Sequence, residues 1–279
     1  MDDKPIPQPE NDEIISEVWR TYLTSGRAAE GYKQPWFEHP YLRPIFRALP
    51  ADPRCQICYI PFSGVGGFIS KRLLDVTPSP LNPHMCNVCE RFAERFLGGV
   101  EMEVSVLFAD IRGSTPLAEK MSTREFSHLI RRFYNAAVKP LYANNALIEK
   151  FVGDGLTAFF VPAFAGPNHA RTAIKAGREI LKATGHGEGK TPWLPVGVGV
   201  NTGMAYIGSM KVESGRTDIS ILGDTVNTTA RLCSEAAAGE LLIGNHAKIA
   251  SDLPLDGHEK RTLSLKGKQT SVDAWVIKA

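Results

Sequence analysis

Hydrophobic positions along the chain follow two patterns, a helical one near the start and a strand–helix alternation over the last two thirds. Between residues 13 and 25 the apolar positions lie three or four apart, and Ser25-Gly26 then supplies a stop, which predicts one amphipathic helix. Residues 31–53 mix aromatic residues with several prolines, a pattern typical of short helical turns that pack against a neighbour.

From residue 101 onward, strand and helix patterns alternate. Apolar and β-branched runs predict strands over residues 104–109, 147–152, 156–161, 196–200, 204–207, 218–222, 240–243 and 272–277. Amphipathic spacing predicts helices over residues 125–142, 169–184 and 225–237. The order βαββαβ with additions indicates an α+β fold of the ferredoxin-like kind, with one sheet and helices mainly on one of its faces.

The same patterns divide the chain into four expected segments. They are a flexible tail over residues 1–12, a helical segment over 13–53, a small four-cysteine segment over 54–98 and a larger α+β domain over 99–279.

The composition of the chain excludes several classes of protein. Hydrophobic residues at 43% and charged residues at 22% exclude a collagenous, low-complexity or wholly disordered chain. The formal net charge of +2 gives no basis for a nucleic-acid partner. The longest apolar run, residues 156–165, is interrupted by Pro162, and the polar start lacks a signal-peptide core. We therefore expect no membrane span, a cytoplasmic location and reduced cysteines.

Four of the five cysteines form two Cys-x-x-Cys pairs, with residues 59–85 between them: Cys55 and Cys58, then Cys86 and Cys89. Each pair places two thiolates on one tight knuckle, and two knuckles complete four sulfur ligands around a tetrahedral ion. The second pair opens a helical run, so the segment looks like a treble-clef zinc finger. We expect Zn²⁺, with an iron–sulfur cluster as the alternative, and the metal either staples the segment or senses a signal.

The run over residues 61–67, between the two cysteine pairs, is rich in glycine. It lacks the Gly-Lys-Ser/Thr ending of a phosphate-binding loop. We interpret it as a tight turn beside the first knuckle.

Two carboxylates stand at strand ends in the larger domain. Asp110 follows the apolar strand 104–109 and precedes a glycine turn and a helix start, a context that suits both a hard cation and a phosphate. Asp154 lies in a Gly-Asp-Gly turn at the tip of a hairpin. Alone, each is ordinary cap or turn chemistry, but paired carboxylates on adjacent strands can bridge two Mg²⁺ ions that activate a hydroxyl and neutralise a triphosphate.

A third element lies on the helix predicted over residues 225–237. Asn227 and Arg231 are four residues apart and therefore share one helical face. Alone, Arg231 is read as an exposed arginine, but an arginine near a developing negative charge stabilises a transition state.

Together these elements resemble the class III nucleotidyl cyclases, the family of adenylyl and guanylyl cyclases. The resemblance covers residues 101–279, and the run from Gly223 to Arg231 is highly specific to it. It implies that Asp110 and Asp154 hold two Mg²⁺ or Mn²⁺ ions, with the Ile111 carbonyl as a further ligand. It also implies that Asn227 orients the ribose and that Arg231 stabilises charge at the transferred phosphorus. The phosphates would be held by the backbone amides of Arg112, Gly113, Ser114 and Thr115, with Lys266 as a further contact.

The resemblance assigns base selection to Lys150 and Ser220. Adenylyl cyclases carry lysine at the first position and guanylyl cyclases carry glutamate, and an ammonium suits the N1 acceptor of adenine. Ser220 departs from the aspartate of many adenylyl cyclases, so discrimination is expected to be weaker. Asp218 points to the same side of its strand and is a possible substitute.

These points give the hypothesis of an adenylate cyclase that converts ATP to 3′,5′-cyclic AMP and pyrophosphate for signal transduction. In the resembling family the site is shared between two chains, so a homodimer is expected. One alternative is a cyclase for GTP or a pyrimidine nucleotide. The other is a catalytically silent, nucleotide-binding regulatory module.

Overall fold

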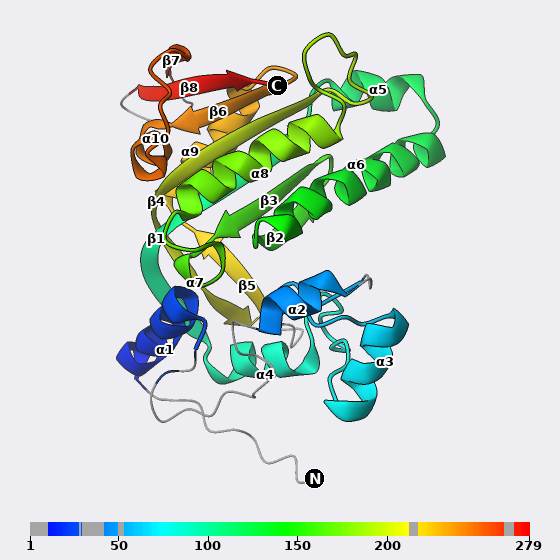
Figure 1. Ribbon diagram of the computed structural model, residues 1–279, viewed down its shortest axis with the longest axis vertical. Helices are drawn as coiled ribbons and strands as arrows, with labels where there is room; N and C mark the ends of the chain where they lie inside the picture. Colours follow the sequence, from blue (N-terminus) through cyan, green and yellow to red (C-terminus); the bar gives the residue numbers. More distant parts are fainter. Residues whose placement is uncertain (1–10, 28, 30–41, 50–52, 212–216, 265–270) are drawn as a thin grey trace. The chain divides into compact units, whose positions relative to one another are not determined.

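The computed structural model describes residues 11–27, 29, 42–49, 53–211, 217–264 and 271–279 (Figure 1). Three expectations fall wholly or partly outside these residues. They are the flexible tail, apart from its last two residues, the short helical turns over residues 31–53, of which only 42–49 and 53 are described, and the phosphate contact at Lys266.

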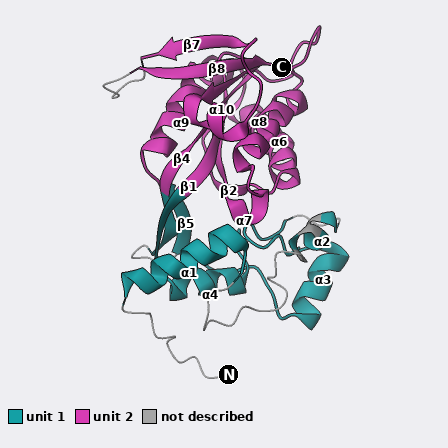
Figure 2. Ribbon diagram, turned by 60° about the vertical axis from the view of Figure 1, so that its left-hand side comes forward, with its two compact units in different colours: residues 1–102, 206–221 teal, residues 103–205, 222–279 magenta. Residues whose placement is uncertain are grey.

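The chain divides into two compact units, which Figure 2 colours separately. Unit 1 comprises residues 1–102 and 206–221, and unit 2 comprises residues 103–205 and 222–279. The helices of unit 1 are α1 (Asp12–Ser25), α2 (Leu42–Ala48), α3 (Gly64–Leu73) and α4 (Asn87–Arg95). Those of unit 2 are α5 (Ser114–Lys120), α6 (Thr123–Ala143), α7 (Pro162–Ala165), α8 (His169–Ala183), α9 (Asp224–Glu235) and α10 (Asn245–Ser251).

The strands form one mixed sheet of eight strands, in the order β2-β3-β1-β4-β6-β8-β7, with β5 paired to β4. They are β1 (Gly98–Ile111), β2 (Leu147–Val152), β3 (Gly155–Phe160), β4 (Val196–Lys211), β5 (Thr217–Leu222), β6 (Glu240–Gly244), β7 (Glu259–Leu263) and β8 (Val272–Lys278). The mixed α+β class expected from the sequence is confirmed.

In unit 1, the predicted N-terminal helix is confirmed as α1. The Asn11 side chain caps its start, and Gly26, in the left-handed region at φ 71°, donates its N–H to the Tyr22 carbonyl at 2.8 Å. Trp19 is fully buried and its indole N–H donates to the Phe96 carbonyl at 2.8 Å. The buried face of α1, which includes Trp19, therefore packs this helix within unit 1.

The tight turn expected over residues 61–67 is wrong. Helix α3 begins at Gly64, and a Cβ on Gly66 or Gly67 would lie 2.6 Å from the Pro61 ring or 2.5 Å from the Phe62 backbone. The glycines allow the helix to pack against the chain that precedes it. Without side chains they carry no helical periodicity, which is why the sequence pattern missed the helix.

In unit 2, helices cover both faces of the sheet, but mainly one. Buried residues of α6, α8 and α10 share a core with Leu241 and Ile243 of β6. Leu242, which points to the opposite face, packs instead with Leu232 of α9 and with Ala236, which follows this helix. Figure 1 shows α6 and α8 side by side along one face of the sheet.

Two strands predicted over residues 196–200 and 204–207 are one continuous strand, β4. The polar pair Asn201 and Thr202 interrupts the apolar pattern, but both residues are buried. Thr202 Oγ1 lies 2.7 Å from Ser105 Oγ on the neighbouring strand β1, which supplies the partner that a buried hydroxyl needs. Helix α10 and strand β7 were not predicted. Among the described helices, none is both long and apolar enough to cross a membrane.

Candidate active site and four-cysteine cluster

Strand pairing brings the two predicted metal carboxylates together. Strands β1 and β3 are antiparallel with Asp110 opposite Gly155, so the turn that holds Asp154 lies beside the end of β1. The Ile111 N–H donates to the Asp154 carbonyl at 3.2 Å and ties this turn to the strand end. The Tyr134 hydroxyl donates to the Gly153 carbonyl at 2.6 Å from the other side of the turn.

The charge state of Asp110 reflects this crowding. Burial raises the pKa of Asp110, the Asp154 charge raises it further, and the nearby Arg112 guanidinium opposes both. Arg112 forms an ion pair with the Asp110 carboxylate. A positive group therefore already stands where the paired carboxylates would hold a cation, and the donor set of two carboxylates and one carbonyl is the kind that Mg²⁺ prefers.

The backbone after Asp110 corrects one expectation. The Arg112 N–H donates to the Pro195 carbonyl at 2.8 Å, so this amide is engaged within the fold and does not face a phosphate. The guanidinium also donates to the Ser234 carbonyl at 3.2 Å. Gly113, at φ 67°, then turns the chain into α5, where Ser114 and Thr115 begin the helix. The phosphate contacts expected at residues 113–115 stay a prediction.

Sequence reasoning missed the Arg112 side chain as part of the site. It predicted only an amide contact at this position. A signal was present, because Arg112 follows Asp110 by only two residues and a guanidinium that near in sequence can reach the carboxylate.

Helix α9 carries Asn227 and Arg231 and lies directly on β4. A Cβ on Gly197 or Gly199 would come within 2.8 Å of the Ala236 carbonyl and 2.4 Å of the Cys233 amide, so only glycine allows this approach.

The buried side of α9 is Thr225, Thr228, Thr229, Leu232 and Cys233. Asn227 is exposed and Arg231 half-buried on the other side. Among the described residues, no hydrogen bond or ion pair joins either side chain to Asp110 or Asp154.

The two predicted base-selecting residues lie in different units. Lys150, on β2 in unit 2, is exposed, and its ammonium lies 3.2 Å from a carboxylate oxygen of Glu149. Ser220, half-buried, lies on β5 in unit 1. On the same strand, Asp218 accepts a hydrogen bond from the Asn82 side chain at 2.9 Å.

The four predicted thiol ligands meet in unit 1. The Sγ atoms of Cys55, Cys58, Cys86 and Cys89 all lie within 4.8 Å of one another, and all four residues are buried. The Cys58 and Cys86 sulfurs are 3.8 Å apart. Four thiolates at Zn–S bonds of about 2.3 Å in a tetrahedron stand roughly 3.8 Å apart, so this spacing fits a single tetrahedral ion.

The electrostatics of the cluster point the same way. Burial raises the pKa of Cys55, but hydrogen bonds from the other three cysteines outweigh burial and bring it well below its usual value. Hydrogen bonding to Cys55 raises the pKa of Cys58 and of Cys89 well above theirs. Four buried sulfurs cannot all be ionised without a compensating cation. The fifth cysteine, Cys233, lies apart, and burial raises its pKa to about 12.

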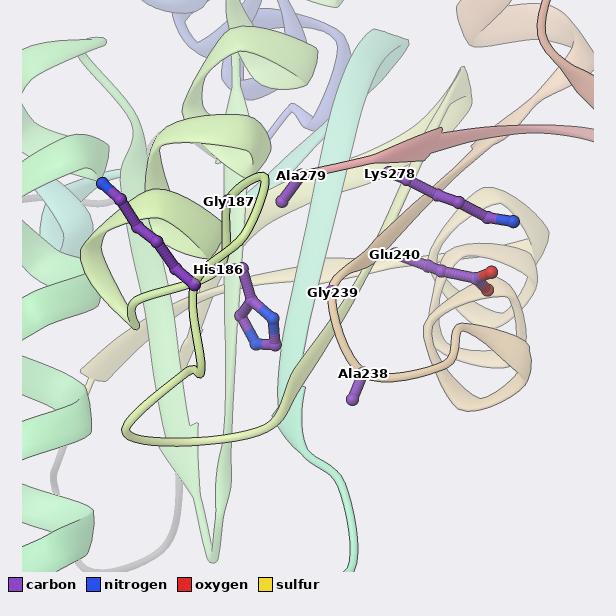
Figure 3. A pocket seen from close by; sticks show the side chains of 8 residues that line it. His186, Gly187, Ala238, Gly239, Glu240, Lys278 and Ala279 are labelled. Atoms are coloured by element: carbon purple, nitrogen blue, oxygen red, sulfur yellow. The ribbon is translucent and has the colours of Figure 1, made fainter.

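A small pocket of about 220 Å³ in unit 2 holds none of the predicted site residues (Figure 3). It is lined by His186, Gly187, Lys190, Ala238, Gly239, Glu240, Lys278 and Ala279. His186 is buried, and its Nε2 accepts the Val196 N–H at 3.1 Å. Glu240 is bound by Arg261 through two contacts of 2.7 Å. These polar groups have structural partners, so the pocket is not the candidate active site.

Comparison with known proteins identifies the family. The sequence model described as the adenylate and guanylate cyclase catalytic domain matches residues 100–279, and the chain belongs to this family. Its structure resembles the guanylyl cyclase Cya2 (TM-score 0.58, 26% identity, 64% of this chain and 93% of that one). It also resembles the adenylyl cyclase CyaB from P. aeruginosa (TM-score 0.55, 28% identity, 64% and 95%).

Curated relatives of similar sequence include the uncharacterized protein Rv1319c of Mycobacterium tuberculosis, which is 28% identical over 180 residues. The match covers 60% of this chain and 33% of the relative. This chain thus spans about a third of the length of the first curated relatives it matches. The similar structures include both adenylyl and guanylyl cyclases, so they define the family and leave the base of the nucleotide substrate open.

Proposed function

We propose that this protein is an adenylate cyclase that converts ATP to 3′,5′-cyclic AMP and pyrophosphate. The observation that carries a cyclase reaction is the pair Asp110 and Asp154, held side by side by the register of β1 and β3 and by the Ile111 contact. Bound there with the Ile111 carbonyl, two Mg²⁺ or Mn²⁺ ions would lower the pKa of the ribose 3′-hydroxyl and neutralise the triphosphate.

The chain's own residues hold the reacting groups. Asp110, which pairs with Arg112 in this structure, would hold the cation when it is bound. The amides of Gly113, Ser114 and Thr115 face the phosphates. The 3′-oxygen loses its proton to solvent water and bonds to the α-phosphorus in line, while the bond to the leaving pyrophosphate breaks.

The exposed side of α9 supplies the other half of the site. Asn227 orients the ribose by hydrogen bonding, and Arg231 stabilises the charge that develops at the α-phosphorus. Because neither side chain is joined to the carboxylates within the described chain, we place them against the carboxylates of a second copy. The active form is then a homodimer with two composite sites.

Lys150 supports ATP as the substrate. Its ammonium donates hydrogen bonds, which suits N1 of adenine and opposes the N1–H of guanine. Ser220 accepts from the adenine amino group. Since a hydroxyl also donates to a carbonyl, cyclisation of GTP or a pyrimidine nucleotide is the second candidate.

At the four cysteines we propose one Zn²⁺. The sulfur spacing supports a mononuclear tetrahedral ion, whereas an iron–sulfur cluster places several iron and sulfide atoms between the thiolates and needs them further apart.

The deciding experiment incubates the purified chain with ATP, GTP, CTP and UTP separately, with Mg²⁺ or Mn²⁺, and identifies the products by mass spectrometry. Cyclic AMP as the main product supports the proposal. A different cyclic nucleotide as the main product would show that the enzyme prefers that base to adenine. No cyclic product from any of the four triphosphates would favour the catalytically silent nucleotide-binding module.

A further inference from the structure

The chain between the two cysteine pairs contains a compact loop, residues 79–85, folded around two buried polar side chains. Ser79 and Asn82 are 2% and 4% exposed. The Ser79 hydroxyl accepts the N–H groups of Leu81 and Asn82 at 3.1 and 3.0 Å, and the Met85 N–H donates to the Asn82 carbonyl at 2.9 Å. These contacts fix the backbone at Asn82, and the His84 N–H donates to the side-chain oxygen of Asn82 at 3.3 Å, which orients that side chain.

Both cysteine knuckles hold this loop. The Ser79 hydroxyl donates to the carboxylate of Glu90, the residue after Cys89. The Gln56 N–H, inside the first pair, donates to the His84 carbonyl at 2.9 Å. Cys86 follows the loop directly. The loop therefore cannot shift without moving one side of the sulfur cluster.

Asn82 reaches from this loop to strand β5, which is 135 residues away in sequence and lies in the same unit. Its amide nitrogen lies 2.9 Å from Asp218 Oδ1 and 3.3 Å from the Thr217 carbonyl. A hydrogen bond to a carboxylate is among the stronger ones in proteins. Asp218 and Ser220 are two residues apart, so the side chain that Asn82 holds is on the same face of β5 as Ser220.

We infer that Asn82 is a positioning residue that couples the four-cysteine metal site to base selection on β5. With metal bound, the knuckles fix the loop, and Asn82 holds Asp218 and the edge of the strand that presents Ser220. When the metal is lost, the loop and β5 loosen together, and discrimination between nucleotide bases falls. This inference rests on the proposed function, because it takes Ser220 to contact the base.

The first test measures hydrogen exchange of the amides of residues 217–222 in the full chain. Asn82→Asp keeps the size and the acceptor of the side chain but removes the donor, and Asn82→Ala removes both. Asn87→Ala is the matched control, because the Asn87 side chain bonds to Asp75 and Thr77 inside the segment and, among the described residues, has no hydrogen bond to β5. We expect the amides of residues 217–222 to exchange at least tenfold faster in both Asn82 variants than in the wild type. The same increase is expected in the wild type after a soft-donor chelator removes zinc in the presence of excess Mg²⁺. The Asn87→Ala control should exchange at the wild-type rate.

The second test compares kcat/KM for ATP and GTP. A smaller folded fraction lowers both values equally, whereas loss of positioning changes their ratio. We expect the ratio to move three- to tenfold toward one in both Asn82 variants and in the zinc-free wild type, with no further change when zinc is removed from Asn82→Asp.

Wild-type exchange in both Asn82 variants, with zinc still bound, overturns the coupling. Faster exchange with an unchanged ATP to GTP ratio overturns the role in base selection. A wild-type chain that cyclises no nucleotide overturns the proposed function instead, and the exchange rates then still decide whether Asn82 holds β5.

Discussion

At the scale of single residues, the site is built around charges that oppose one another. Asp110 is partly buried beside Asp154, and both effects disfavour its ionised form. Because the folded pKa of Asp110 is raised, the free energy of unfolding falls as pH rises above the unfolded pKa of about 3.9, and a nearby positive charge compensates part of this loss. Arg112 supplies part of that compensation.

Replacing either carboxylate should abolish turnover without unfolding the chain. We expect Asp110→Asn and Asp154→Ala each to lower kcat by at least roughly 100-fold, because each removes a ligand of the catalytic cations. We also expect Mn²⁺ to raise the melting temperature of the wild type but not that of Asp110→Asn. Asp256→Ala, at an exposed position, is the control. Full activity in either site variant would contradict the metal assignment.

Changing the charge at Lys150 should change the preferred base. Lys150→Glu places a carboxylate opposite N1, where it repels the adenine acceptor and accepts from guanine N1–H. We expect kcat/KM for ATP to fall at least about tenfold while that for GTP falls less or rises. The exposed Lys182→Glu is the control. Equal loss for both nucleotides would show that Lys150 does not face the base.

At the scale of elements, close backbone approach and buried polar contacts position the site. Gly197 and Gly199 let α9 lie on β4. On the neighbouring strand β1, the Ser105 hydroxyl oxygen lies 2.9 Å from His169 Nδ1 at the start of α8. Burial lowers the pKa of His169, with the Glu103 charge opposing it only in part.

This histidine should make the fold sensitive to acid. Its folded pKa lies below the unfolded value of about 6.5, so the unfolded chain binds more protons and stability is lost as pH falls below about 6.5. In His169→Gln the free energy of unfolding should depend less on pH between 5 and 6.5, measured by urea denaturation. His246→Gln, on an exposed position of α10, is the control. An identical pH profile in His169→Gln would contradict this.

The four-cysteine cluster should bind one metal ion per chain. We expect about one zinc by elemental analysis, lost in Cys58→Ser and retained in Cys233→Ser, because the fifth cysteine lies outside the cluster. If zinc loss changes turnover without changing the melting temperature, the metal has a regulatory role. If zinc loss lowers both turnover and the melting temperature, the metal holds the segment folded. A brown protein containing iron would favour a cluster, and a folded wild type without metal would remove both assignments.

At the scale of the whole molecule, the proposed site needs two chains. The carboxylates lie on β1 and on the β2–β3 turn, whereas Asn227 and Arg231 lie on the exposed side of α9. In a two-fold symmetric, head-to-tail dimer, the carboxylates of each chain would face Asn227 and Arg231 of the other chain, which gives two sites.

Complementation tests this assembly. Asp154→Ala and Arg231→Ala chains are each expected to be inactive, but a mixed dimer contains one intact site. An exchanged equimolar mixture should recover about a quarter of wild-type activity, since half the dimers are mixed and each has one site of two. Arg231→Ala mixed with Asn227→Ala damages the same half and should recover nothing. Mixed dimers, verified by mass, that stay inactive would contradict a shared site.

The sequence by itself determined the class of fold, the pairing of cysteines into one cluster and the family, because these depend on local periodicity and on short motifs whose spacing survives in the chain. The predicted carboxylates, Asp110 and Asp154, also meet as strand pairing requires. The segment boundaries at residues 13, 54 and 99 stay predictions. Ser220 and Lys150 stay predicted base contacts.

Only the tertiary structure decided which polar groups are engaged. The Arg112 N–H is bonded to the Pro195 carbonyl, and the Arg112 guanidinium pairs with the Asp110 carboxylate. The tertiary structure also places helix α3 in a glycine run, and it joins Asn82 to Asp218 across 136 residues. Hydrogen bonds between distant segments leave no period in the sequence, because their partners are chosen by the packing of whole elements and not by neighbours along the chain.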